Sequence, residues 1–246
     1  MDRIAPTRRP DARPSGHQVW EKLLFVHYAF PAEVVRALVP PELDLDLWED
    51  GQAWVGLVPF AMKGIRPAFI PFGIDFLETN LRTYVSRKDE PGVFFFSLEA
   101  SSLLAVEAAR FGWGLPYFHA DMSLRAEGTR VHYASTRRGT AVPARSVVEC
   151  RIGKALGPSA AGTLEHFLLE RYYLFTVREG RVSKGHVHHA PYVAHEAELL
   201  SQPEGHEGLF CAAGLPAPVG PPSAVHYSAG VDVEVFGPWE EKADGA

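Results

Sequence analysis

The sequence has few of the features that would assign it quickly to a class. Its 246 residues include two cysteines, Cys150 and Cys211, which we expect to be free buried thiols because a chain this long needs no disulfide. No apolar run is long enough to cross a bilayer, and the N-terminus lacks the apolar segment of a secretory signal. The 24 basic residues are outnumbered by 30 acidic ones, unlike the composition of a nucleic-acid-binding protein. We therefore predict a cytoplasmic protein that binds neither membranes nor nucleic acid.

Familiar catalytic and cofactor motifs are also missing. The serines have no nucleophile-elbow pattern and the glycines form no phosphate-binding loop, which disfavours a serine hydrolase or a nucleotide enzyme. His186 and His188 share one face of a predicted strand and could ligate one ion, with His189 beside them. No nearby cysteine or carboxylate completes a ligand spacing, so we predict structural hydrogen bonds for these histidines and expect no metal and no cofactor.

The residues that are present can build a large core, since 46% are hydrophobic and 11% aromatic. Residues 1–16, rich in Arg and Pro, predict a disordered tail, residues 17–238 a single domain, and residues 239–246 a C-terminal tail. A segment dense in Pro and Gly, 203–223, predicts a long ordered loop. Strands are expected near 20–30, 43–62 as a hairpin, 74–85 paired with 92–101, 117–125, 129–137, 145–152, 172–177, 182–189 and 231–236, and helices near 31–39, 101–111 and 164–172, the last capped by Thr163.

Many short strands with a few short helices predict a mainly β (α+β) fold. The spacing favours a single antiparallel β-barrel or sandwich with the helices packed outside. Such proteins often self-associate, so we include a homo-oligomer among the expected partners.

A polar stripe in FLETNLRTYV is the most informative pattern in the chain. Strand alternation places Glu78, Asn80, Arg82 and Tyr84 on one face. A strand that faces solvent could carry these residues. They also suit a barrel interior, where an arginine holds a carboxylate while glutamate and tyrosine transfer protons.

A second polar face occurs in FGWGLPYFHADM, where glycines and a proline precede a strand with Tyr117, His119 and Asp121 on one side. Histidine and tyrosine can exchange protons when burial tunes them, although a half-exposed strand with a core tyrosine has the same pattern. Further along, Glu170 and Arg171 could line a cavity or form an ion pair that anchors a helix end, and we favour the anchor.

With these residues identified, the chain resembles the YqjF-like uncharacterised bacterial family. The matching stretches run from about residue 20 to 236 and include VVRALVPPEL, FLETNLRTYV, ARFGWGLPYFHADM, HFLLERYYLFT, the HHAPY turn and VHYSAGVDVEVF. The arrangement is more remotely similar to the acetoacetate decarboxylase superfamily, in HYAFPAEVVRALVPPEL, in the aromatic-x-Glu strand that ends at Glu78, and in the GWGLPYF loop. This resemblance implies an acetoacetate decarboxylase-like β-barrel with a pocket that contains Glu78.

The same resemblance implies that the superfamily's usual chemistry is absent. The decarboxylases carry two lysines after the loop proline, and one of them, with its amine kept neutral, forms a Schiff base with the keto acid. These positions correspond here to Tyr117 and Phe118, and a phenol cannot form an iminium. The substrate-binding arginine of the first strand corresponds to Ala29, with His27 and Tyr28 beside it.

The leading hypothesis is a protein that binds a small organic carboxylate or carbonyl compound in an aromatic-lined barrel cavity. If it is an enzyme, we expect lysine-independent proton transfer or hydration, not Schiff-base decarboxylation. The alternatives are a non-catalytic sensor or carrier and a structural oligomeric protein with a filled barrel. The expected catalytic residues are Glu78, Tyr117 and His119, and the expected ligand-binding residues are Arg82, Asn80, Tyr84, His27 and Tyr28.

Overall fold

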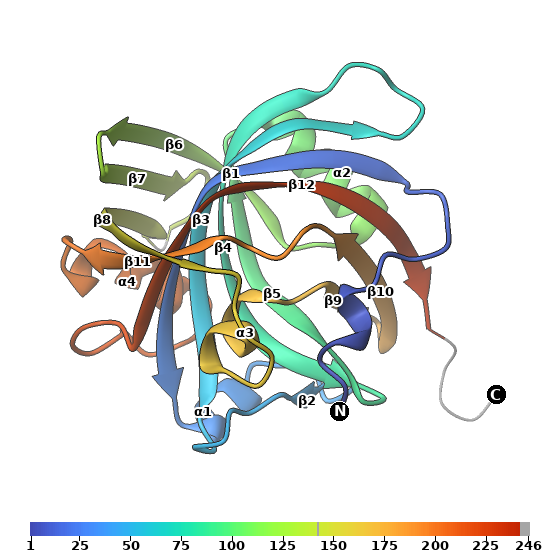
Figure 1. Cartoon of the computed structure of the whole chain (residues 1–246), viewed down its shortest axis with the longest axis horizontal. Helices are drawn as coiled ribbons and strands as arrows, with labels where there is room; N and C mark the ends of the chain where they lie inside the picture. The colour runs from blue at the N-terminus through green and yellow to red at the C-terminus, as the bar shows by residue number, and fades with distance from the viewer. Residues whose placement is uncertain (142, 242–246) are drawn as a thin grey trace.

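The strands of this protein form one twelve-stranded sheet that closes on itself (Figure 1). The computed structural model describes residues 1–141 and 143–241. The helices are α1 (Ala32–Arg36), α2 (Leu103–Trp113), α3 (Leu164–Leu169) and α4 (Glu207–Ala212), with short 3₁₀ turns η1 (Ala5–Thr7) and η2 (Pro203–Gly205). The strands are β1 (Gly16–Phe30), β2 (Asp44–Leu45), β3 (Ala53–Pro67), β4 (Ile74–Arg87), β5 (Glu90–Ala100), β6 (Tyr117–Glu127), β7 (Arg130–Arg137), β8 (Arg145–Gly157), β9 (Tyr173–Arg178), β10 (Arg181–His188), β11 (Ala194–Leu199) and β12 (Ala224–Glu240).

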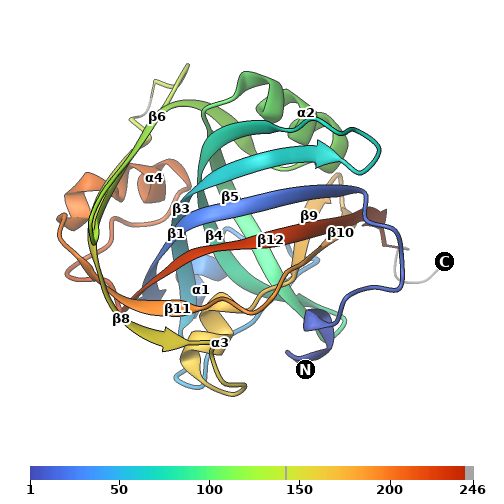
Figure 2. The same cartoon turned by 45° about the horizontal axis from the view of Figure 1, so that its top comes forward.

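The sheet branches at two strands, and this branching creates the space for a site. One edge of β5 pairs with β9 over Gly92–Phe94 and with β6 over Leu98–Ala100. In the same way, β12 pairs with β11 near residue 227 and with β10 from residue 234 onward. The sheet therefore contains two rings that share β12, β1, β3, β4 and β5 (Figure 2). One ring is closed by β9 and β10, and the other is closed by β6, β7, β8 and β11.

The helix α2 positions the strand that begins at Tyr117. The Ser102 hydroxyl accepts a hydrogen bond from the backbone N–H of Ala105 at 3.3 Å, so it caps the helix N-terminus. Gly114 ends the helix at φ 67°, a left-handed conformation that suits glycine. The next residues return the chain to β5, where the amide of Leu98 donates to the carbonyl of Pro116 at 3.0 Å.

The structure confirms the predicted mainly β class and corrects several local predictions. The hairpin expected over residues 43–62 is wrong, because β2 pairs with β4 at Val85 and Ser86, beyond the last β3 partner at Thr83. The expected loop over residues 203–223 contains α4, whose Leu209 and Phe210 are fully buried. Sequence analysis also missed β11. Cys150 is buried as expected, whereas Cys211 is exposed.

Both segments expected to be tails contain residues with defined contacts in the described part of the chain. Near the N-terminus, Pro6 is buried, its carbonyl lies 2.8 Å from Nε2 of His186, and Arg3 pairs with Asp46. At the C-terminus, β12 extends to Glu240, and residues 242–246 of the expected tail lie outside the described residues. None of the helices in the described part of the chain has the length and apolarity that a membrane span requires.

Candidate functional site

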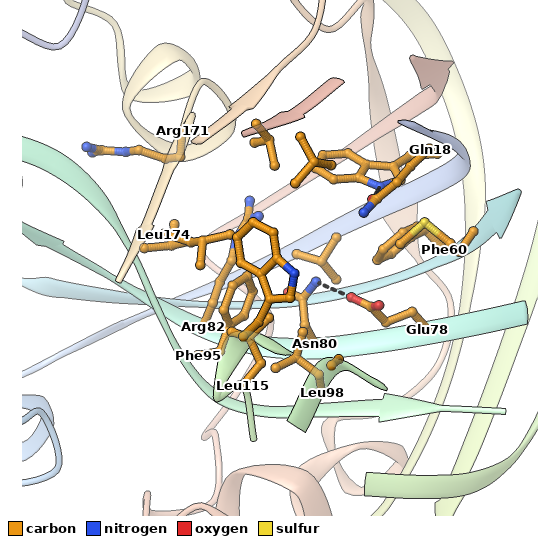
Figure 3. Close-up of a pocket in the computed structure, with 18 of the residues that line it drawn as sticks. Gln18, Phe60, Glu78, Asn80, Arg82, Phe95, Leu98, Leu115, Arg171 and Leu174 are labelled. Carbon is orange, nitrogen blue, oxygen red and sulfur yellow. Dashed lines mark hydrogen bonds between the residues drawn. The ribbon is translucent and has the colours of Figure 1, made fainter. Parts of the chain in front are cut away.

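A cavity of about 130 Å³ lies inside the ring of strands closed by β9 and β10 (Figure 3). Each strand of that ring contributes at least one lining side chain, and α2 and β6 complete the wall. Most of the lining is apolar or aromatic. The lining residues include Glu78, Asn80 and Arg82 of β4, Tyr117 of β6, Trp113 of α2 and Tyr192 after β10.

The polar stripe of β4 faces this cavity. Glu78 is 3% exposed and Arg82 is 8% exposed, and both line the cavity together with Asn80. On the opposite side of the strand, Leu81 and Val85 are buried in the main hydrophobic core. The alternation of β4 therefore separates a polar cavity wall from a face that packs Leu81 and Val85 into the core.

Glu78 is the acid/base candidate of the cavity. The hydroxyl of Tyr117 donates to its Oε2 at 2.7 Å. The amide of Asn80 donates to its Oε1 at 3.4 Å, the bond drawn in Figure 3. Burial raises the pKa of Glu78 to about 7, against the two hydrogen bonds, which lower the pKa. The carboxyl group can therefore hold or release a proton near neutral pH, as general acid/base catalysis requires.

Arg82 is the cavity's candidate for binding an anion. Its Nε and Nη2 are buried without a hydrogen-bond partner among the described residues. The guanidinium carbon also lies 5.7 Å from the centre of the Phe25 ring. A buried cation with unused donors is costly unless an anion pairs with it, and a carboxylate fits the guanidinium in two parallel hydrogen bonds.

Two of the predicted ligand-binding residues lie behind this wall. The Tyr84 hydroxyl donates to the carbonyl of Leu168 at 2.7 Å and lies 2.7 Å from Nε2 of His27. Because the tyrosine proton is used in this way, Nε2 of His27 carries the proton of that second bond. Burial and the nearby charge of Arg82 hold the pKa of His27 well below its usual range, so the ring is neutral. His27 and Tyr84 thus support β4 and do not line the cavity.

Two other predicted residues lie elsewhere. Tyr28 is buried in the main core, and its hydroxyl lies 2.8 Å from Nε2 of His206. His119 is absent from the cavity lining, since β6 pairs with β5 only as far as this residue and then continues toward β7. Two residues further on, the exposed Asp121 accepts a 2.9 Å hydrogen bond from Arg138. The structure thus brings together Glu78 and Tyr117 of the three predicted catalytic residues.

Arg171 anchors the end of α3, although its partner is not Glu170. Its Nη1 donates to Asp46 at 2.7 Å and its Nε to the carbonyl of Phe167 at 2.7 Å, and in Figure 3 the guanidinium points away from the cavity. Glu170 instead accepts from the Tyr172 hydroxyl at 2.6 Å and from the Tyr192 amide at 3.0 Å. These bonds position Tyr192 in the cavity wall.

Sequence reasoning overlooked Trp113 and Tyr192 as wall residues. Both stand in motifs that carry the family resemblance, FGWG and HHAPY, which was the available signal. His186 and His189, predicted to be structural, contact the carbonyls of Pro6 and Ala190 at 2.8 Å. Among the residues that the structure describes, no three His, Cys, Asp or Glu side chains are grouped to hold a metal ion.

No lysine lines the cavity in the described part of the chain. Lys63 is exposed and pairs with Asp75 at 2.9 Å, and Lys184 pairs with Glu90 at 2.6 Å. The resemblance assigns the Schiff-base lysine to the position of Tyr117, which does line the cavity. The described cavity wall therefore offers no lysine amine that could form a Schiff base.

The fold that surrounds this cavity is an acetoacetate decarboxylase-like fold. The enduracididine biosynthesis enzyme MppR, complexed with the condensation product of pyruvate and imidazole 4-carboxaldehyde, aligns with a TM-score of 0.64 at 13% identity, over 93% of this chain and 90% of its own. Acetoacetate decarboxylase from Legionella pneumophila aligns with a TM-score of 0.61 at 14% identity, over 97% of both chains. At such identities the likeness establishes the fold alone.

The chain belongs to the DUF2071 family, described as uncharacterized conserved protein (COG2071), whose model matches residues 17–232. YqjF of Bacillus subtilis is 36% identical over 198 residues, which are 77% of this chain and 78% of that protein. These findings confirm both the YqjF-like resemblance and the remoter one.

Proposed function

We propose that this protein binds a small 2-oxo acid in the cavity and catalyses proton transfer at the carbon next to its carbonyl group. The observation that carries the proposal is the buried Arg82, which lines the same cavity as Glu78 and has N–H donors without a hydrogen-bond partner among the described residues. A cavity of about 130 Å³ suits a ligand of roughly six non-hydrogen atoms, since benzene fills an engineered cavity of similar size. Structural relatives support this choice, because MppR has been solved in complex with pyruvate.

The chemistry follows from the positions of three side chains. Arg82 holds the carboxylate of the ligand, and the deprotonated form of Glu78 removes a proton from the carbon beside the carbonyl. The electron pair of the broken C–H bond moves to the carbonyl oxygen, which becomes an enolate. Arg82 and the Tyr117 hydroxyl stabilise this negative charge, and Glu78 returns the proton. This cycle needs neither a lysine nor a cofactor, and we place it in the cytoplasm.

The experiment is hydrogen exchange of pyruvate in D₂O, followed by the loss of its methyl signal in proton NMR. We expect the protein to accelerate the exchange, and Glu78→Gln to abolish the acceleration while pyruvate still binds. The exposed Glu107→Gln of α2 is the matched control and should exchange at the rate of the unmodified protein.

A second candidate is a non-catalytic sensor or carrier, which the missing lysine favours. A carrier binds pyruvate through Arg82 but leaves its methyl protons unexchanged. Binding without exchange in the unmodified protein would therefore contradict the catalytic proposal and select the carrier.

A further inference from the structure

A second, larger chamber adjoins the cavity, and residues of α2 and of the loop from β3 to β4 are among those that line it. Its volume is about 490 Å³. Phe72 and Ile74 line it from the loop and the start of β4, and Leu104 lines it from α2. We call it the outer chamber. The residues that line both the outer chamber and the cavity are Gln18, Ile65, Ala109, Trp113, Tyr117 and Val235, so these residues form the boundary between the two spaces.

The outer chamber exposes large apolar side chains to water. Phe72 is 83% exposed and Leu104 is 69% exposed, although both belong to a concave wall. Exposed apolar side chains that line a hollow are suited to contact an apolar partner.

The order of polar and apolar groups along the two spaces indicates which parts of a ligand should be polar and which apolar. Arg82, with its unpartnered donors, and Glu78 line the cavity but not the outer chamber. The boundary between the two spaces includes Ile65, Ala109 and Trp113. Most residues at this boundary are apolar or aromatic, so an apolar chain suits the path from a carboxylate at Arg82 toward the outer chamber.

Resting on the proposed function, we infer that the natural ligand class is carboxylates with an extended apolar tail, whose head occupies the cavity and whose tail occupies the outer chamber. Each methylene moved from water into an apolar site contributes about 0.8 kcal/mol, which is about a threefold to fourfold gain in affinity. Pyruvate then represents the head group alone.

The test is calorimetric titration of straight-chain 2-oxo acids from three to ten carbons against the whole protein. The chain offers two matched pairs of variants. Phe72→Ser alters the outer chamber, whereas Phe69→Ser alters an equally exposed phenylalanine of the same loop outside its lining. Leu104→Ser and its neighbour Leu103→Ser form the second pair, of which Leu104 alone lines the chamber.

We expect affinity to rise with chain length in the unmodified protein, Phe69→Ser and Leu103→Ser. In Phe72→Ser and Leu104→Ser the long chains should lose about tenfold in affinity, while pyruvate binds as before. An affinity that stays flat with chain length while pyruvate binds would overturn the tail inference and leave the proposed function intact. Failure of every chain length to bind would overturn both.

The chamber could instead be an interface between copies of this chain. In that case Phe69→Ser and Phe72→Ser would both shift the sedimentation coefficient, and neither would change the dependence on chain length. That result would also overturn the inference.

Discussion

The substitution Glu78→Gln should make the protein more stable, and the gain should depend on pH. The variant replaces a buried carboxyl group by a neutral amide of nearly the same shape. The carbonyl oxygen of the new side chain can still accept the hydrogen bond that Tyr117 donates, and its amide can donate to Oδ1 of Asn80, which has no partner in the described structure. The change therefore removes the charge without opening a cavity.

The magnitude follows from the pKa of Glu78, which burial raises from 4.5 to about 7. At about 1.4 kcal/mol for each pKa unit, this difference corresponds to about 3 kcal/mol. Below pH 4.5 both the folded and the unfolded state hold the proton, so the folded state has no penalty. As the pH rises from 4.5 to 7 the unfolded state releases its proton first, and stability falls. Above pH 7 the loss is constant at its full value.

The assay is urea denaturation of the unmodified protein and Glu78→Gln at pH 5, 6, 7 and 8. We expect the two proteins to have similar free energies of unfolding at pH 5, where most of the penalty is absent. At pH 8 the variant should be more stable by about 3 kcal/mol. A domain of this size gains about 2 to 4 °C in Tm for each kcal/mol, so thermal melts should show about 6 to 12 °C. The control Glu107→Gln changes the net charge equally at an exposed site of α2.

One result would refute this reasoning. If the difference between Glu78→Gln and the unmodified protein is the same at pH 5 and pH 8, Glu78 does not titrate in this range. The carboxyl group would then not be suited to proton transfer at neutral pH, and the catalytic part of the proposal would fall with it.

Two further substitutions separate the site from its surroundings. Tyr117→Phe removes a hydrogen bond that lowers the pKa of Glu78, so carboxyl-carbon NMR should find that pKa above about 7, and an unchanged value would contradict the contact. Tyr28→Phe removes a buried hydrogen bond to His206 and should cost about 1 kcal/mol in urea denaturation. Its affinity for pyruvate should equal that of the unmodified protein, and a loss of binding would place Tyr28 in the site.

The sequence alone predicted the central wall of the site because strands have a simple period. Alternation along β4 puts Glu78, Asn80 and Arg82 on one face and Leu81 on the other, whatever lies beside the strand. Tyr84 obeys the same alternation but lies deeper, bonded to Leu168 and His27. Strand periodicity thus predicted which residues share a face of β4, but it could not predict which of them line the cavity.

Errors arose where the answer depends on distant parts of the chain. His119 shares a strand face with Tyr117, yet β6 leaves β5 after that residue, and only the branching of the sheet shows this. Residues 44 and 45 pair with β4 and not with β3, because both edges of β3 are taken by β1 and β4. Such pairings are decided by the whole sheet. In α4, burial of Leu209 and Phe210 stabilises a short helix within a segment whose Pro and Gly content predicted a loop.

Arg82 carries the account's central claim, and the most direct measurement is calorimetric titration of pyruvate into the unmodified protein, Arg82→Met and Arg125→Met. Arg82→Met should fold, because it replaces a buried cation whose Nε and Nη2 lack partners by an apolar side chain of similar length. Arg125 is exposed on β6 and serves as the control for the lost charge. We predict that pyruvate binds the unmodified protein and Arg125→Met equally, and binds Arg82→Met at least thirtyfold more weakly, about 2 kcal/mol. Equal binding by all three proteins would contradict it.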